Sequence, residues 1–359
     1  MPFRTFLEAH QLLGSRVEYK ILDVNELSPD SLGTFDIVLF FGVLYHLRHP
    51  LQGLERVLAL TKDLALVESF VSSDEPRRGA PVLEFYEATQ LGGQLDNWYG
   101  PTTDCLLALC RSAGFAQVRL ETVGNQRASV TCKRRWPAAP EHPTVEPPWL
   151  MTATNNRNFE CRFHPAKDEY LCCFFLTSAI NPRPEDVLVE VDGFGTPSLV
   201  VTNNGDRSWQ VNCLRPPGLS AGRHSVRLRM KESGYSDEVD IFVIGDAEGS
   251  SSQEIPGSGV PPSATVEFLR VEYDSARDLR YADPGFVRCH FKVNCGRISA
   301  QDIDVFVGDS KCHIRNVMRR PDHWEAHVSL PAGISPGTYS ASLRVRGAVA
   351  VARIPVTLP

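Results

Sequence analysis

Three residues that could take part in chemistry follow one apolar run directly. Residues 37–41 are all apolar, and Gly42, Tyr45 and His46 come immediately after them. A glycine lets a ligand approach the backbone, a tyrosine hydroxyl forms hydrogen bonds, and an imidazole exchanges a proton near neutral pH. This pattern allows a binding site with acid–base chemistry. An ordinary loop between a strand and a helix fits the same residues.

The elements that must hold these residues form an α/β pattern. The apolar run is rich in β-branched and aromatic residues, which predicts a strand buried on both faces of a parallel sheet. Ligands bind beyond the carboxyl ends of such strands. Apolar spacing predicts the other elements of residues 1–135, which are helices over 3–13, 50–60 and 103–113 and strands over 17–22, 64–71, 117–122 and 128–133.

Composition divides the rest of the chain into linkers and β regions. Residues 136–150 are rich in proline, and residues 247–262 are rich in glycine, serine and proline, so both predict linkers. Residues 151–246 and 263–359 show short apolar runs broken by Pro, Gly and Asn, as in all-β sandwiches. The predicted fold class is therefore α/β followed by two all-β domains.

The two β regions are copies of one sequence. Trp209 matches Trp324, and residues 218–225 match residues 333–340 at the same offset, with glycine, serine and apolar residues shared. Such self-similarity predicts tandem domains. The repeated phrase resembles the immunoglobulin-like domains of the transcription-factor and plexin type. That resemblance implies two tandem immunoglobulin-like β-sandwiches and says nothing about their ligand, so a protein or a glycan is a candidate partner.

Charge and composition exclude some classes of function. The net charge is −6, and residues 1–135 hold 14 Lys and Arg against 16 Asp and Glu, so no basic excess favours a nucleic-acid surface. No apolar stretch approaches the roughly 18 residues of a membrane span, and the first residues lack a signal-peptide core. We therefore expect a cytoplasmic protein without a membrane partner.

The ten cysteines lack the spacing of a metal site or a disulfide framework. They form no Cys-x-x-Cys pair and no His/Cys cluster with zinc spacing. We expect buried free thiols and no metal site. A disulfide between strands of a β domain is the alternative, which a cytoplasmic setting disfavours.

Residues 1–135 carry several phrases of one enzyme family. These are Leu-Gly-Ser-Arg-Val-Glu-Tyr at 13–19, Leu-Asp-Val at 22–24, Phe-Asp-Ile-Val at 35–38, Gly-Val-Leu-Tyr-His at 42–46 and Arg-Ser-Ala-Gly-Phe at 111–115. Together they resemble a class I S-adenosylmethionine-dependent methyltransferase with a Rossmann-like fold, nearest the tRNA wobble-uridine carboxymethyltransferase group in which Gly-Val-Leu-Tyr-His recurs. The resemblance implies S-adenosylmethionine as the cofactor.

The resemblance implies cofactor contacts for four residues. Asp23 would end the third strand of the fold and accept a hydrogen bond from the adenine amino group, with Val24 against the ring. Gly42 and Val43 would let the backbone approach the methionine part of the cofactor. Without the resemblance, a cap for the following turn is the simpler role for Asp23.

The resemblance also implies residues on the acceptor side. Tyr45 would lie beside the transferred group, and His46 would orient the substrate or accept its proton, with a structural histidine as the alternative. Arg127 would correspond to an anion-binding arginine. Trp98 and Tyr99 would form part of a lid over the acceptor, with core packing as the alternative for Trp98.

One feature of the family is absent from this sequence. No Gly-x-Gly occurs before Gly42, so the glycine-rich cofactor loop and the first two strands of the family have no counterpart. We expect either an N-terminally truncated methyltransferase fragment with impaired cofactor binding or a degenerate remnant. A shrunken sheet, in which residues 17–22 pair directly with residues 36–41, is a further alternative.

Three functions follow from these patterns. The first is methyl transfer from S-adenosylmethionine to a small-molecule, glycan or RNA acceptor. The second is a non-catalytic binding or scaffold protein that acts through the immunoglobulin-like domains. The third is wobble-uridine modification of tRNA, as in the family group named above.

Overall fold

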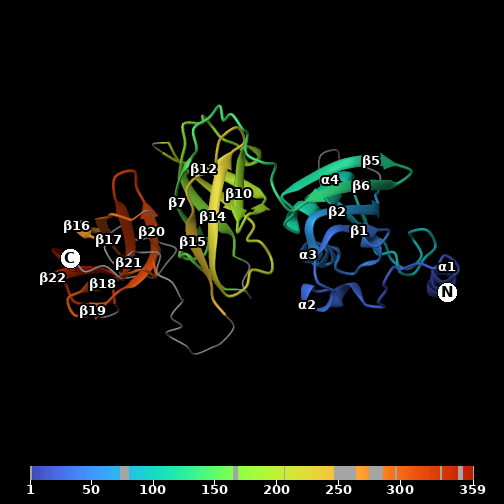
Figure 1. The fold of residues 1–359 in the computed structure, drawn as a ribbon, viewed down its shortest axis with the longest axis horizontal. Helices are drawn as coiled ribbons and strands as arrows, with labels where there is room; N and C mark the ends of the chain where they lie inside the picture. Colours follow the sequence, from blue (N-terminus) through green and yellow to red (C-terminus); the bar gives the residue numbers. More distant parts are fainter. Residues whose placement is uncertain are drawn as a thin grey trace.

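The chain folds around three hydrophobic cores in three units that follow each other along the molecule (Figure 1), and the core of the third unit also includes Cys161 and Phe242 of the second. The computed structural model describes residues 2–72, 81–164, 169–205, 207–245, 264–274, 286–295, 297–331, 334–346 and 351–358. The predicted linker at 247–262 lies outside these residues. No helix among them combines the length and the apolar character that a membrane crossing requires.

The first unit is a four-stranded sheet with helices. Its strand order is β1 (Phe35–Phe41), β2 (Thr61–Phe70), β6 (Arg127–Lys133) and β5 (Gln117–Gly124). Strands β1 and β2 are parallel, whereas β6 runs antiparallel to both β2 and β5. The predicted strands at 64–71, 117–122 and 128–133 are confirmed, within the usual uncertainty of their ends.

The predicted helices of this unit are confirmed. They are α1 (Pro2–Leu12), α3 (Pro50–Leu60) and α4 (Thr103–Ser112). The unit also contains a short helix, α2 (Pro29–Leu32), and the one-turn helices η1 (Val24–Glu26) and η2 (Leu44–His46). Helix α3 connects the two parallel strands and buries Leu54, Val57 and Leu58 almost completely. Burial of one such side chain stabilises the fold by about 1.5–3 kcal/mol.

The predicted strand at 17–22 is wrong. Residues 15–23 have no regular secondary structure, and Ile21 is 75% exposed. An alternating sequence forms a strand only beside a partner that satisfies its backbone groups, and β1 pairs with β2 alone among the described strands. Asp23 therefore does not end a strand, and residues 17–22 do not pair with β1 in a shrunken sheet.

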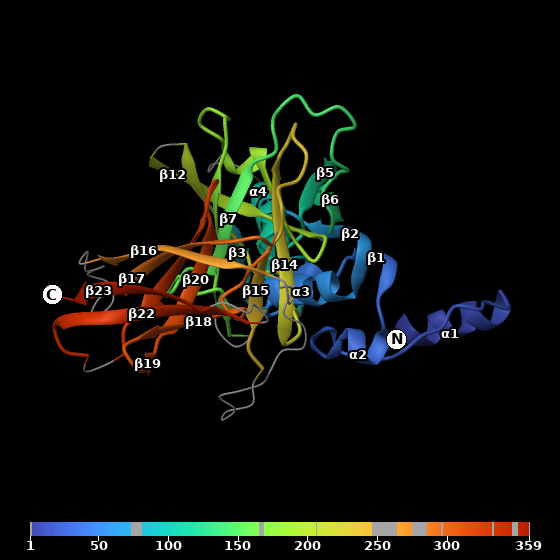
Figure 2. The same ribbon diagram turned by 60° about the vertical axis from the view of Figure 1, so that its left-hand side comes forward.

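The expectation that β1 is buried on both faces is also wrong. Phe40 is 6% exposed and faces the core, but Leu39 is 61% exposed. The alternation extends along the strand, with 46–59% of the surface exposed at Phe35, Ile37 and Phe41. Strand β1 also forms one edge of the sheet, and in Figure 2 it is the strand of this sheet drawn nearest to α1. Only one face of β1 therefore packs against the core, and the apolar side chains on its other face are exposed.

The second unit consists of two sheets around one core. One sheet has the order β11 (Phe194–Thr196), β10 (Val187–Val191), β14 (Gly222–Met230), β15 (Val239–Val243) and β8 (Arg162–Phe163). The other has the order β12 (Ser198–Gly205), β13 (Ser208–Cys213), β9 (Leu171–Leu176) and β7 (Trp149–Asn155). A single turn, η3 (Pro184–Asp186), precedes β10. Because β7 begins at Trp149, the proline-rich segment ends earlier than predicted.

The third unit repeats the strand order of the second, except that β8 has no counterpart among the described strands. Its sheets are β16 (Val266–Asp274), β17 (Phe286–Val293), β21 (Trp324–Ser329) and β20 (His313–Arg319), and β19 (Ser310–Lys311), β18 (Ile303–Val307), β22 (Gly337–Val345) and β23 (Val351–Leu358). Trp209 in β13 and Trp324 in β21 are each 8% exposed and pack into the two cores. The internal repeat is confirmed.

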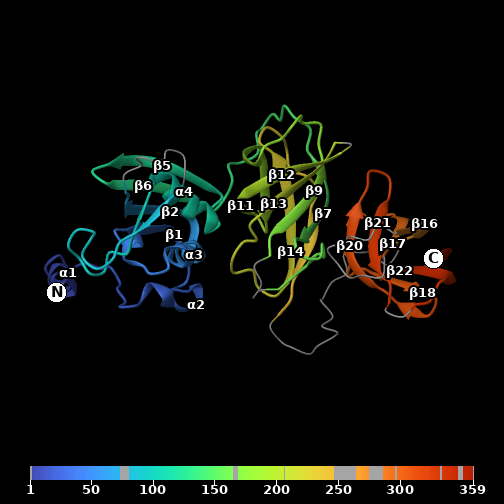
Figure 3. The same cartoon turned by 180° about the vertical axis from the view of Figure 1, so that it is seen from behind.

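The three units also follow one another in the view from behind (Figure 3), and side-chain hydrogen bonds join consecutive units. Trp136 Nε1 donates to the Val189 carbonyl oxygen at 2.8 Å, between the first and second units. Trp149 Nε1 donates to the Arg319 carbonyl oxygen at 3.0 Å, between the second and third. Each interface thus includes an indole hydrogen bond to the backbone of the next unit.

Candidate functional site

The candidate site lies at the carboxyl ends of β1 and β2. Phe41, the last residue of β1, is in register with Glu68 of β2, and the Gly42 amide donates to the Glu68 carbonyl oxygen at 3.1 Å. Phe70 at the end of β2 pairs with Arg127 at the start of β6. Sheet register therefore brings Gly42, Glu68 and Arg127 to the same end of the strands.

Gly42 turns the chain out of the sheet. Its φ of +69° lies in the left-handed region, which favours glycine. A Cβ at this position would lie 3.6 Å from Arg127 Nη2 and 3.7 Å from the Tyr45 hydroxyl. The one-turn helix η2 follows, anchored by Leu44, which is 1% exposed. Gly42 therefore keeps the backbone open beside these two polar groups.

Arg127 connects Glu68 to Tyr45. Its Nε and Nη2 donate to the two Glu68 oxygens, with an Nη2–Oε2 distance of 2.9 Å, and Nη1 donates to the Tyr45 hydroxyl at 3.2 Å. The hydrogen bonds to Glu68 and then to Tyr45 raise the pKa of Arg127. Asn125 and Gln126 form the hairpin turn before it, both with positive φ. This pairing fixes the orientation of the Tyr45 hydroxyl.

His46 lies against Tyr45 and against the loop that contains Asp96. The two ring centroids are 4.3 Å apart, and His46 Nδ1 is 3.1 Å from the Asp96 carbonyl oxygen. Because a carbonyl oxygen only accepts, Nδ1 is the donor, and Nε2 of the neutral ring is left as an acceptor. His46 is half-buried, so it combines a fixed ring with an available basic nitrogen.

A row of aromatic side chains extends from the Tyr45 ring through Phe70 to Tyr86. Strands β3 (Leu83–Phe85) and β4 (Tyr99–Pro101) form a small hairpin-like pair. Phe70 packs edge-on against Tyr45 and against Tyr86, with centroids 6.4 and 6.3 Å apart. Burial and the hydrogen bond to Glu84 raise the pKa of Tyr86 to about 12. Tyr86 is thus neutral at physiological pH.

The predicted lid residues lie next to the site. The Trp98 amide donates to the Tyr45 carbonyl oxygen at 2.9 Å, and the Arg48 guanidinium lies 4.4 Å from the centre of the Trp98 ring. Phe85 stacks with Trp98 and contacts Tyr99 edge-on. The contact with substrate stays a prediction for both Trp98 and Tyr99.

The predicted adenine-binding residues lie on the loop before η1. Asp23 Oδ1 accepts from the Asn25 amide at 2.8 Å and caps η1, so the simpler role as a cap is present. Asp23 is exposed. The Val24 and Val43 side chains pack against the first core, so each would offer a ligand its backbone. The adenine contact stays a prediction.

Sequence reasoning missed Glu68. A carboxylate inside the otherwise apolar run of β2 was the available signal, because buried charges are paired in folded proteins. The structure thus brings Tyr45, His46, Gly42 and Arg127 together and adds Glu68 to them. As a group they can orient a ligand by hydrogen bonds, accept a proton at His46 Nε2 and shield a reacting centre with aromatic rings.

Parts of the chain resemble solved protein structures. No family model and no curated protein matches the sequence. The N-terminal domain of EvdMO1, solved with SAH bound, is 25% identical with a TM-score of 0.29, over 37% of this chain and 60% of that one. The present chain therefore spans about three fifths of that domain.

Two further solved structures resemble the chain in part. An O-methyltransferase family protein from Burkholderia thailandensis is 18% identical with a TM-score of 0.28, over 36% of this chain and 39% of that one. EvdMO1 itself is 13% identical with a TM-score of 0.26, over 64% of this chain and 77% of that one.

Proposed function

We propose that the first unit binds S-adenosylmethionine and directs its methyl group to an acceptor. The observation that carries this proposal is the meeting of Gly42, Tyr45 and Arg127 at the carboxyl ends of two parallel strands. These are the residues at which the methyltransferase phrases predict the cofactor and the acceptor. SAH, bound in the EvdMO1 domain, is what remains of this cofactor after methyl transfer.

The residues present fit the two ends of such a cofactor. At Gly42 a side chain would fill the space beside the Tyr45 hydroxyl and Arg127, so glycine leaves room for a methionine group. Asn25 donates two hydrogen bonds to Asp23 Oδ1, and the Glu26 amide also donates to this exposed carboxylate. The remaining lone pairs of the carboxylate can accept from an adenine amino group.

The chain's own residues would align the acceptor and take its proton. When bound, the cofactor supplies an electrophilic methyl group on a sulfonium sulfur. Tyr45, held by Arg127, would orient the acceptor, and His46 Nε2 would accept the proton that the acceptor loses. Phe70 and Tyr86 would limit the access of water to this place. Such a transfer requires alignment more than covalent catalysis.

The proposed site suits more than one class of acceptor. A small molecule, a glycan and an RNA nucleotide each present a nucleophilic group whose proton His46 could accept. The 14 basic and 16 acidic residues in residues 1–135 favour no RNA surface, so wobble-uridine modification gains no support from charge.

The second and third units suggest a second function, as immunoglobulin-like binding domains. Their shared strand order and the equivalent Trp209 and Trp324 support this fold. In this alternative, the chain recognises a protein or glycan partner through the repeated units, and the first unit has no catalytic role.

Differential scanning calorimetry of the whole chain tests the proposal. SAH should raise the unfolding temperature of the first unit alone, because a ligand at about 100 times its Kd stabilises the unit that it binds by about 2.7 kcal/mol. Leu54→Ala identifies that transition, since Leu54 is fully buried in the first core. If SAH shifts no transition, or shifts a β-unit transition instead, methyl transfer by the first unit is contradicted.

A further inference from the structure

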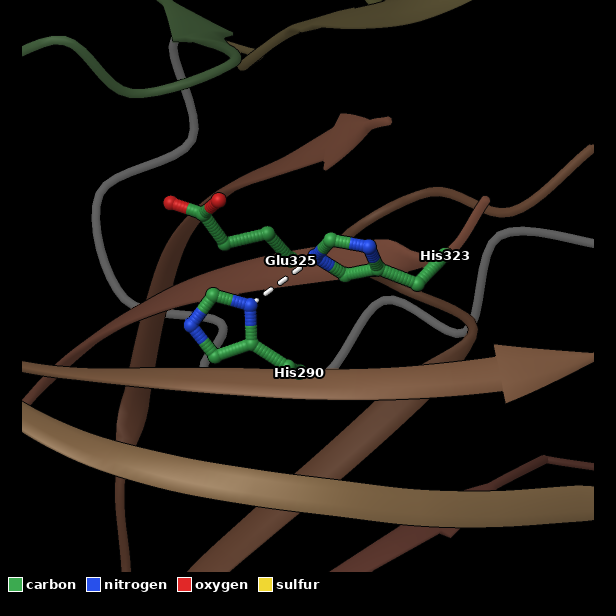
Figure 4. A group of neighbouring side chains, drawn as sticks. All are labelled: His290, His323 and Glu325. Carbon is green, nitrogen blue, oxygen red and sulfur yellow. Dashed lines mark hydrogen bonds between the residues drawn. The ribbon is translucent and has the colours of Figure 1, made fainter. Parts of the chain in front are cut away.

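Two histidines and a glutamate meet on one sheet of the third unit. His290 of β17 is in register with Glu325 of β21, and His323 lies in the turn just before β21 (Figure 4). These three form the one group of metal-ligating side chains that the described part of the chain brings together. Sequence spacing predicted no metal site, because His290 and the other two residues belong to different strands.

The distances suit a shared cation. His290 Nδ1 and His323 Nε2 are 2.9 Å apart, and one oxygen of Glu325 completes a group whose ligand atoms all lie within 4.8 Å of each other. Two ligands of one tetrahedral Zn²⁺ ion lie roughly 3.4 Å apart, given bonds of about 2.1 Å. To bind one ion, the two nitrogens would move slightly apart and the Glu325 oxygen would move closer to them.

The outer nitrogens of both rings face carboxylates. His323 Nδ1 is 2.7 Å from Asp322 Oδ1, and His290 Nε2 is 3.4 Å from Glu272 Oε2, without a hydrogen bond of its own. The inner nitrogens, His290 Nδ1 and His323 Nε2, share a hydrogen bond, so one of them carries the proton. A cation would take the place of that proton between the two rings, and a carboxylate behind each histidine is the usual arrangement around bound metal.

Burial keeps this group in a form that can bind metal. His290 and Glu325 are each 3% exposed. Burial lowers the pKa of His290, which is the direction that a neutral imidazole ligand requires. Glu325 accepts hydrogen bonds from Arg320 and His327 and is ionised, and each of its oxygens has a second lone pair. Arg270 pairs with Glu272 at 2.9 Å, which offsets its positive charge near His290.

We propose that His290, His323 and Glu325 bind a divalent transition-metal ion, for which Zn²⁺ is the best match. Two imidazole nitrogens and one carboxylate form a set that zinc uses with a fourth position for water. Harder ions such as Mg²⁺ and Ca²⁺ prefer ligand sets made of oxygen. The site is separate from the candidate site of the first unit.

The position of the group suggests a structural role for the ion. Arg320, which holds Glu325, also contacts the Met151 sulfur of β7 at 3.6 Å, and the neighbouring Arg319 carbonyl accepts from Trp149. An ion on His323 would therefore fix the turn at 320–323, which lies against the second unit. Metal binding would stabilise the third unit and its contact with the second.

Calorimetric titration of the chelator-treated chain with ZnCl₂ tests the proposal. We expect one saturable site and, with Co²⁺ as the probe, a visible absorption band typical of tetrahedral coordination. His323→Ala should weaken binding at least tenfold, since the loss of an orienting group alone costs roughly 10- to 100-fold. His323 lies in a turn with 16% of its side chain exposed, so this variant should fold.

The control is His313→Ala in the same unit. His313 is a histidine that pairs with Glu160 and belongs to no metal-ligating group. It should leave Zn²⁺ affinity unchanged. Two results would overturn the proposal: no saturable Zn²⁺ binding by the unsubstituted chain, or wild-type affinity in both His323→Ala and Glu325→Gln, which would place the ion elsewhere.

Discussion

Arg127 Nη1 lies 3.2 Å from the Tyr45 hydroxyl, although 82 positions separate the two residues in the chain. The contact exists because β2 runs parallel to β1 and antiparallel to β6, so the last residues of β1 and the first residues of β6 lie at the same end of the sheet. Glu68 fixes the other side of the guanidinium. The position of the Tyr45 hydroxyl therefore depends on a charge pair.

Glu68→Gln should destabilise the first unit. The substitution removes one charge of a two-pronged pair in which Glu68 is 17% exposed, and such charge-assisted bonds contribute about 1.5–3 kcal/mol. Scanning calorimetry should show a lower unfolding temperature for the first unit only. Glu121→Gln, which breaks an exposed pair with Arg119, should leave it unchanged. Equal behaviour of the two variants would mean that the Glu68 pair is no stronger than a surface pair.

Comparison of Gly42→Ala with Gly33→Ala should separate the effect of backbone strain on stability from an effect on ligand binding. Gly42 and Gly33 both have left-handed φ, at +69° and +74°, so alanine at either position should cost about 1–3 kcal/mol of stability. A Cβ at Gly33 meets nothing within 4 Å, whereas one at Gly42 approaches Arg127 and the Tyr45 hydroxyl. SAH affinity, measured by titration, should fall in Gly42→Ala and stay unchanged in Gly33→Ala. A similar affinity for SAH in both variants would remove Gly42 from the site.

Local sequence patterns predicted most of the fold because they report short-range physics. Helix α3 appears where apolar residues recur at helical spacing, and the paired Trp209 and Trp324 indicated the repeat that the strand order confirms. The strand predicted at 17–22 failed because a strand also needs a neighbour, which alternation within one segment does not specify.

The site was predictable only in part for the same reason. Gly42, Tyr45 and His46 are close in sequence, so a single phrase indicates them. Glu68 joins Arg127 through the register of β2 with β6, and His290 joins Glu325 through the register of β17 with β21. Register arises from pairing between distant segments, and no local pattern in this chain reports it.

Strand β1 should promote self-association. It is an edge strand whose Leu39 side chain is 61% exposed, and exposed apolar edges pair with other chains. Leu39→Lys should lower the average mass of the chain in sedimentation velocity at high concentration. Val123→Lys adds the same charge on β5, at the opposite edge of the sheet, where Val123 is 58% exposed. An equal decrease in both variants would assign the effect to net charge.

The thiols should be unreactive in the folded chain. All ten cysteines are free, and nine of them are buried. Burial raises the pKa of Cys161 and Cys213 to about 12, so at pH 8 almost none of either is the reactive thiolate. A thiol reagent should modify at most Cys295 in the native chain and ten thiols after denaturation. Cys295→Ser should abolish the native reaction, and fewer than ten thiols after denaturation would reveal a disulfide.

The most direct measurement of the central claim is an isothermal titration of the whole chain with SAH. Binding at the carboxyl ends of β1 and β2 predicts one saturable site per chain, with the affinity reduced at least about tenfold in Arg127→Ala, because Arg127 Nη2 lies 3.6 Å from the Cβ position of Gly42 and so borders the space proposed for the methionine group. No heat of binding in the unsubstituted chain, or undiminished affinity in Arg127→Ala, would contradict the assignment of a methyl-donor site to these residues.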